Sequence, residues 1–256
     1  MTSRTTVTNL SESPVGDPAV PRYEITEWRA EHGVVAGITG REGGFDIGLS
    51  SADAIDVVLG RWSALRESLK PGFSGLVVSR QVHGAEIATH LHPVDGLLIA
   101  EGLDGHATQL RGLVLGVTVA DCVPVYLVDP NSRAVALLHA GWRGVAAGVL
   151  ERGIDCLCGI GAAAPDDLLV HCGVGICGGC YEVGCEVYQA VTGRRVEGPA
   201  LLDLRAALIE RARALGVVDI SVSGWCSAHD AEQFHSHRVS GGMAGRMLAY
   251  IGLPVT

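Results

Sequence analysis

The sequence predicts an α+β fold, a layered sandwich built as a single domain. Short Val- and Leu-rich runs of strand length are grouped in the middle of the chain, and helical patterns lie on either side of them. Groups of strands separated by groups of helices favour a layered sandwich over regularly alternating βαβ units. The 256 residues are enough for one large core, so we expect one domain over residues 22–256 and a flexible tail over the Ser-, Thr- and Pro-rich residues 1–21.

The first elements after this tail are a strand and a helix. Residues 34–38 form a short apolar run that ends in the glycine-rich turn 39–44, which carries Arg41. Residues 54–69 place apolar side chains at three- and four-residue spacing, and Pro71 follows. This pattern predicts an amphipathic helix.

The remaining elements follow from the same two patterns. Short apolar runs predict strands over residues 76–82, 97–100, 113–119, 123–128, 134–138, 168–174 and 220–225. Helical periodicity predicts helices over residues 144–159, 204–215 and 243–251, the second of which is capped by Asp203.

The composition excludes several classes of protein. The formal net charge of -9 lacks the basic field that binds phosphate backbones, so no nucleic-acid partner is expected. The apolar runs are much shorter than the roughly 20 residues that cross a bilayer. The first residues lack the pattern of a secretory signal. In such a chain the eight cysteines indicate reduced thiols and a cytoplasmic location.

Potential metal ligands stand where three of the predicted strands end. His83 follows the run 76–82, Cys122 follows the run 113–119, and His139 follows the run 134–138. Two imidazoles and one thiolate suit zinc, and three protein ligands leave a fourth position for water or substrate, which is typical of catalysis. A lone buried histidine or cysteine is more often packed or hydrogen-bonded, and spacing alone does not show that these three side chains meet.

Three sequence motifs carry a resemblance to a known family. The segments QVHG at 81–84, ADCVP at 120–124 and HAGWRG at 139–144 closely resemble the signatures of the YfiH-like (DUF152) family, and they occur in its order. The turn 39–44 and the CYEVG segment at 180–184 are similar to further family motifs. The family is also known as the multicopper polyphenol oxidoreductases.

The resemblance implies a fold, a cofactor and an activity. The fold would be a layered α/β/β/α sandwich of mixed sheets, and His83, Cys122 and His139 would bind Zn²⁺. Members resemble purine nucleoside phosphorylases that act on adenosine, inosine, guanosine and methylthioadenosine with phosphate, and that also deaminate adenosine. Arg41 and Arg143 would line the pocket, where a guanidinium suits phosphate.

Two carboxylates are candidates for proton transfer during catalysis. Asp121, directly before Cys122, and Glu182, in the CYEVG segment, could each shuttle the proton in deamination. Asp121 could instead orient a histidine ring, as ligands of metal sites commonly require. The sequence leaves both roles open.

Three other functions stay open at this point. Two histidines with a cysteine also match a copper site, although this chain lacks the several His-x-His pairs of multicopper oxidases. Members of the family have been linked to editing of peptidoglycan precursors, in which Cys122 would be a nucleophile with His139 as its base. Finally, the cysteine-rich stretch 156–185 could form a structural zinc or thiol module, and its CxxC pair Cys177 and Cys180 a metal or redox site.

Overall fold

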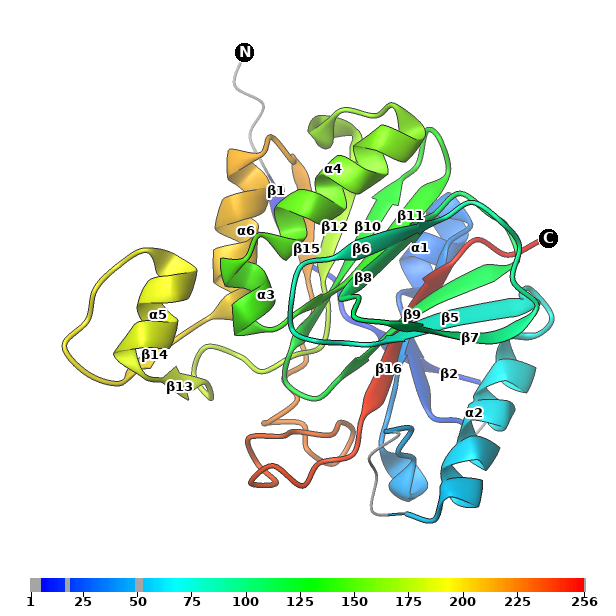
Figure 1. Cartoon of the computed structure of the whole chain (residues 1–256), viewed down its shortest axis with the longest axis horizontal. Helices are drawn as coiled ribbons and strands as arrows, with labels where there is room; N and C mark the ends of the chain where they lie inside the picture. The colour runs from blue at the N-terminus through cyan, green and yellow to red at the C-terminus, as the bar shows by residue number, and fades with distance from the viewer. Residues whose placement is uncertain (1–5, 17–18, 49–52, 256) are drawn as a thin grey trace.

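The chain folds into two stacked β-sheets with helices on both outer faces (Figure 1). The computed structural model describes residues 6–16, 19–48 and 53–255, and within these ranges the strands form two seven-stranded sheets and one two-stranded sheet. The first sheet has the order β1 (Thr6–Asn9), β15 (Asp219–Val222), β12 (Leu169–Cys172), β10 (Val123–Asp129), β11 (Ala134–Ala140), β8 (Gly105–Thr108), β6 (Ile87–His90). The second sheet has the order β2 (Ser13–Val15), β3 (Arg22–Glu24), β4 (Val35–Thr39), β16 (Met247–Gly252), β9 (Leu113–Val119), β5 (Gly75–Arg80), β7 (Gly96–Glu101).

Both large sheets are mixed. In the second sheet β5 runs parallel to β7 and to β9, whereas β16 is antiparallel to both of its neighbours. The small sheet pairs β13 (Glu182–Val183) with β14 (Ala200–Leu201). The helices are α1 (Thr26–His32), α2 (Ile55–Leu69), α3 (Trp142–Ala146), α4 (Val149–Gly161), α5 (Cys185–Thr192) and α6 (Leu204–Ala214), with 3₁₀ turns at Glu42–Gly44 and Pro165–Asp167.

The layers follow from how the apolar side chains are distributed. Leu115 and Ala249 of the second sheet pack with Leu137 of the first in one buried cluster between the sheets. Helices α4 and α6 bury their apolar faces on the outer side of the first sheet, and α2 covers the outer side of the second (Figure 1). The predicted α/β/β/α sandwich is therefore confirmed.

Two predicted helices differ from the structure. The helix predicted over 144–159 is divided into α3 and α4, because Gly148 takes a left-handed backbone conformation with φ of 84°. The helix predicted over 243–251 is wrong, since Met247–Gly252 is strand β16. A central strand between β4 and β9 is apolar on both faces, and such a continuous run also satisfies helical spacing.

Most of the segment that we expected to be a flexible tail belongs to the fold. Residues 6–9 pair with β15 and residues 13–15 pair with β3, while residues 1–5 and 17–18 lie outside the described ranges. Glu12, between these strands, is 1% exposed and is hydrogen-bonded to His171 and Ser223. The polar composition of residues 1–21 suggested a tail, but the carboxylate of Glu12 is hydrogen-bonded inside the protein.

No helix in the described part of the chain is long and apolar enough to cross a membrane.

Candidate metal centre

His83, Cys122 and His139 meet at one end of the sandwich. His83 follows β5, Cys122 lies between β9 and β10, and His139 is near the end of β11. One ligand atom from each side chain lies within 4.8 Å of the others. The two imidazole rings are nearly perpendicular, with centroids 4.8 Å apart. Two strands of one sheet and one of the other therefore bring together the three ligands expected from the sequence.

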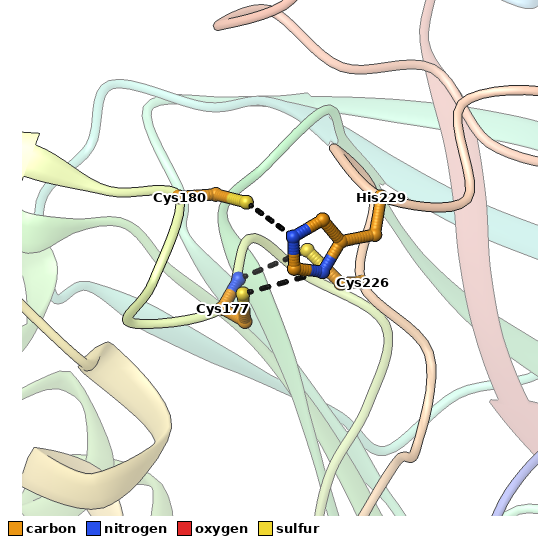
Figure 2. A group of neighbouring side chains, drawn as sticks. All are labelled: Cys177, Cys180, Cys226 and His229. Atoms are coloured by element: carbon orange, nitrogen blue, oxygen red, sulfur yellow. Dashed lines mark hydrogen bonds between the residues drawn. The ribbon is translucent and has the colours of Figure 1, made fainter.

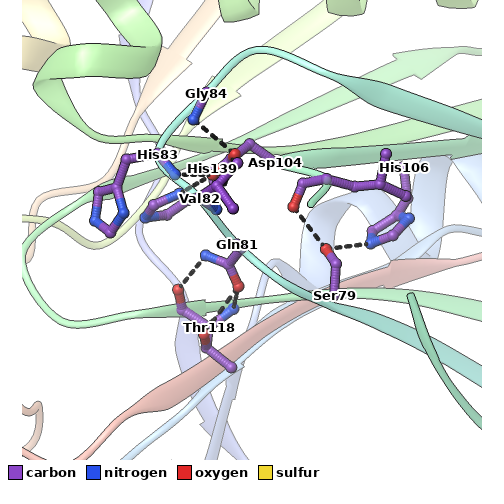
Figure 3. A network of polar contacts seen from close by, with 10 residues as sticks. Ser79, Gln81, Val82, His83, Gly84, Asp104, His106, Thr118 and His139 are labelled. Atoms are coloured by element: carbon purple, nitrogen blue, oxygen red, sulfur yellow. Dashed lines mark hydrogen bonds and ion pairs between the residues drawn. The ribbon is translucent and has the colours of Figure 1, made fainter. Parts of the chain in front are cut away.

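Asp104 holds two of these ligands in place (Figure 3). Its Oδ1 accepts hydrogen bonds from Nδ1 of His139 at 2.8 Å and from the backbone N–H of His83 at 3.0 Å. Its Oδ2 accepts from the backbone N–H groups of Gly84 at 2.7 Å and Val82 at 3.2 Å. Burial raises the pKa of Asp104, but these bonds outweigh burial and lower it, so the carboxylate is ionised.

Asp104 was not found from the sequence. We considered Asp121 as the group that orients a histidine ring, but its carboxylate accepts instead from Ser227 Oγ at 2.7 Å and from the backbone N–H of Arg238 at 2.7 Å. Asp104 lies 35 positions before His139 and outside every recognised motif. No periodicity or spacing rule marks a residue that acts only through contacts made in the folded chain.

The loops that carry the ligands have unusual backbone conformations. His83 has φ of 59° and Asp121 has φ of 84°, a region that non-glycine residues seldom occupy. Gln81 anchors the first loop to β9, because its amide donates to Thr118 O and accepts from Thr118 N and Oγ1, each at 2.8 Å (Figure 3). The strained loops are thus held by hydrogen bonds at their bases, which is typical of functional sites.

Gly141 leaves room for the ligand side chains. A Cβ at this position would lie 3.0 Å from Cys122 Sγ and 3.2 Å from His83 Cδ2. A Cβ on Gly144 would lie 2.8 Å from the carbonyl oxygen of Gly84. Both glycines of the HAGWRG segment are therefore required by close packing around the three ligands.

The ligands also perturb one another electrostatically. Burial alone would raise the pKa of the Cys122 thiol, but the charge of His139 and hydrogen bonds from both histidines lower it to about 6. Burial alone would lower the pKa of His139, but the Cys122 thiolate and the Asp104 carboxylate raise it to about 9. The group is therefore preorganised around a thiolate, the form of cysteine that binds metals and attacks electrophiles.

The three ligands open into a pocket of about 750 Å³. Its wall combines aromatic and cationic side chains, namely Trp62, Trp142, Tyr181, Arg80, Arg143, Arg238 and Arg246. The Arg143 guanidinium lies 4.3 Å from the ring centroid of Trp142, and that of Arg238 lies 5.1 Å from the ring of Tyr181. Stacking leaves the edge of the Arg143 guanidinium available to an anion, whereas Nη1 of Arg238 also donates to Glu182 O at 2.8 Å.

Of the four predicted catalytic residues, two line this pocket and two do not. Arg143 lines the pocket, as the resemblance implies, and Asp121 lines it as well. Contrary to expectation, Arg41 lines a separate hollow of about 190 Å³, where its guanidinium donates to Ala231 O at 2.7 Å. Glu182 is exposed in β13 and is not among the residues that line the pocket. Arg238 and Arg246, which were not among the predicted site residues, line the pocket instead.

Comparison with known proteins gives consistent matches along the chain. Residues 30–254 match the family model described as multi-copper polyphenol oxidoreductase laccase. The purine nucleoside phosphorylase YlmD of Geobacillus stearothermophilus is 32% identical over 247 residues, which cover 86% of this chain and 90% of that protein. Adenosine deaminase RL5, from an unknown prokaryotic organism, is 35% identical over 213 residues, which cover 76% and 80%. The crystal structure of the Geobacillus YlmD superposes with a TM-score of 0.82 at 29% identity, covering 94% of this chain and 98% of that one.

Proposed function

Because the chain belongs to the multi-copper polyphenol oxidoreductase laccase family, we propose that it is a zinc-dependent purine nucleoside phosphorylase that also deaminates adenosine. Relatives named for each activity match most of its length. The observation that carries the proposal is the convergence of His83, Cys122 and His139 on the wall of a pocket that also presents several arginines.

The three side chains fit zinc. Two imidazoles and one thiolate, with donor atoms within 4.8 Å, are a common zinc ligand set, and the pocket beside them gives access to a fourth position. Zinc bound there would supply a Lewis acid that lowers the pKa of a water molecule toward neutrality. Asp104 fixes the ring of His139 through Nδ1, so that Nε2 of this ring is the nitrogen left for a metal.

The arginines fit the anionic co-substrate of phosphorolysis. The protein has a net charge of -9, yet Arg143, Arg238 and Arg246 all line this pocket. A guanidinium binds phosphate through two parallel hydrogen bonds and would hold it against the sugar carbon, where positive charge develops. Phosphate bound near these arginines is the proposed nucleophile.

The remaining wall fits a nucleoside. A volume of about 750 Å³ is within the range of small-molecule sites, and Trp142 and Tyr181 present aromatic surface for a purine ring. Deamination needs a group that accepts and donates a proton; Asp121 is a carboxylate on the pocket wall, whereas Glu182 lies outside this wall. We therefore propose Asp121 for that role.

The test is product analysis with metal-quantified protein. Adenosine with phosphate should give adenine and ribose 1-phosphate, and adenosine without phosphate should give inosine. Cys122→Ala should lose both activities, whereas Cys185→Ser, at an exposed cysteine, should keep both. Failure of the wild-type protein to convert any nucleoside would refute the proposal.

One observation favours a second candidate, a cysteine hydrolase that acts on peptidoglycan precursors. Cys122, His139 and Asp104 form a chain in which a carboxylate orients an imidazole beside a thiol, the arrangement of nucleophilic cysteine enzymes. Zinc bound to Cys122 would block the thiolate that such a mechanism needs as its nucleophile. Stoichiometric zinc that protects Cys122 from iodoacetamide would count against this candidate, while a metal-free, rapidly alkylated Cys122 would favour it.

A further inference from the structure

A second group of potential metal ligands lies outside the centre described above. Cys177, Cys180, Cys226 and His229 each offer one ligand atom, and these four atoms lie within 4.8 Å of one another (Figure 2). We propose that this group is a structural zinc site with three thiolate ligands and one imidazole ligand. Such a set fills all four positions of a tetrahedral zinc ion and leaves none for a substrate.

Two short turns present the ligands in pairs. Cys177 and Cys180 are joined by a hydrogen bond of 3.0 Å from the backbone N–H of Cys180 to the carbonyl oxygen of Cys177. Cys226 and His229 have the same spacing, and their turn is closed by two hydrogen bonds of 2.8 Å between Cys226 and Asp230. Ligand pairs with two residues between them are usual in structural zinc sites, because one turn then directs both side chains to one ion.

Contacts between the two turns already place the donor atoms together. The backbone N–H of Cys177 donates to Cys226 Sγ at 3.3 Å. The ring of His229 lies between the other two sulfurs, with Nε2 3.1 Å from Cys180 Sγ and Nδ1 3.8 Å from Cys177 Sγ (Figure 2). With Zn–S bonds of about 2.3 Å, sulfurs around tetrahedral zinc lie about 3.8 Å apart. The four atoms, within 4.8 Å, would need to approach by about 1 Å at most.

Core packing does not account for this cluster. Cys226 is buried, but Cys177 and Cys180 are partly exposed and His229 is exposed, whereas structural cysteines are usually buried among apolar side chains. A disulfide between Cys177 and Cys180 would use two of the four groups and leave Cys226 and His229 without a function. Zinc gives all four a function, and its binding would displace the thiol protons to solvent.

The position of the site gives zinc a structural consequence. Ile176 and Tyr181, on either side of the first turn, line the large pocket. Ser227, in the second turn, donates to Asp121 at 2.7 Å, and its backbone N–H bonds to Gly175 O at 3.1 Å. An ion that joins the two turns would therefore hold Tyr181 and Asp121 in place from behind the pocket wall.

The test is a count of zinc ions per chain by plasma mass spectrometry, on folded protein purified without added metal. The wild type should hold two. The double variants Cys177→Ser/Cys180→Ser and Cys226→Ser/His229→Ala should each hold one. Cys122→Ala should also hold one, from the second site. Cys185→Ser, a nearby exposed cysteine, is the matched control and should hold two.

Cobalt in place of zinc gives a second readout. In Cys122→Ala the remaining cobalt should show an intense thiolate-to-metal absorption band from three sulfurs, and the band should vanish when Cys177 and Cys180 are also replaced. One zinc in the wild type and no change in the double variants would overturn the proposal. So would an intact-mass loss of two hydrogens that maps to a Cys177–Cys180 disulfide. Because these counts need no substrate, the proposal can hold or fail independently of the nucleoside activity.

Discussion

Oδ1 of Asp104 accepts the Nδ1 proton of His139 at 2.8 Å, and this bond sets the orientation of the imidazole ring. The same carboxylate holds the backbone of the loop that carries His83. One buried side chain thereby positions ligands that come from two different sheets.

Asp104→Asn should therefore weaken metal binding. An asparagine places an NH₂ group against backbone N–H donors or against His139, so zinc affinity should fall about 10- to 100-fold, measured by competition with a chromogenic chelator. Asp129→Asn is the control, because Asp129 is equally buried and accepts hydrogen bonds from its own turn. Equal losses of zinc affinity in both variants would contradict the role of Asp104.

Gly141→Ala should disturb the ligands directly. The added Cβ would press on Cys122 Sγ and His83, so we expect a loss of zinc affinity of at least 10-fold without global unfolding. Gly159→Ala adds a methyl at an exposed position of helix α4, where no atom lies within 4 Å, and should stabilise the protein by about 0.5–1 kcal/mol. Thermal melting and metal titration of the two variants measure this contrast. Unchanged affinity in Gly141→Ala would show that the ligands do not share an ion in this arrangement.

Arg143→Lys should separate the two proposed activities. A lysine cannot form the paired hydrogen bonds of a guanidinium, so the KM for phosphate in phosphorolysis should rise about 10-fold. Deamination uses no phosphate and should change less than about twofold. Steady-state kinetics of both reactions measure this difference. Arg41→Lys, outside the pocket, is the control that should leave both reactions unchanged.

His106 should contribute to acid sensitivity. Burial, with a smaller contribution from His90, lowers the pKa of His106 to about 3. Between about pH 3 and pH 6.5 the unfolded chain therefore binds a proton that the folded protein does not bind. This stabilisation is fully present above pH 6.5 and is lost as pH falls toward 3. Denaturant unfolding at several pH values should show a loss of about 1.4 kcal/mol per pH unit that is absent from His106→Gln. The exposed His92→Gln should keep the wild-type slope.

Glu12 should stabilise the protein through its buried hydrogen bonds with His171 and Ser223. Burial raises the pKa of Glu12, but His171 and Ser223 lower it below 4.5. The contribution is therefore present above pH 4.5 and is lost as pH falls through the lowered value. Glu12→Gln should reduce the free energy of unfolding at pH 7 by about 1.5–3 kcal/mol. The exposed Glu31→Gln should change it by less than about 0.5 kcal/mol. Equal effects would mean that residues 6–16 are not docked as described.

Local patterns predicted a large part of the fold because the strands are well marked. The bounds of β9 are those predicted, and β5, β7, β10 and β11 differ by only a few residues. In β5, β9, β10 and β11 the apolar run coincides with a buried strand between turn residues, whereas β7 is a partly exposed edge strand. β16 was missed because a strand buried on both faces lacks alternation, and β1 and β2 were missed because edge strands need little apolar surface.

The sequence by itself determined the strand-rich sandwich, the motifs and the candidate ligands His83, Cys122 and His139. Residue type and local order are sufficient for these, because a strand run followed by a metal-binding side chain can be recognised within a few positions. Only the tertiary structure decided that Asp104 supports this centre, that Arg41 lines a separate hollow, and that Cys226 and His229 join Cys177 and Cys180. These relationships depend on which distant loops come into contact when the two sheets pack. Local sequence patterns do not specify such long-range contacts.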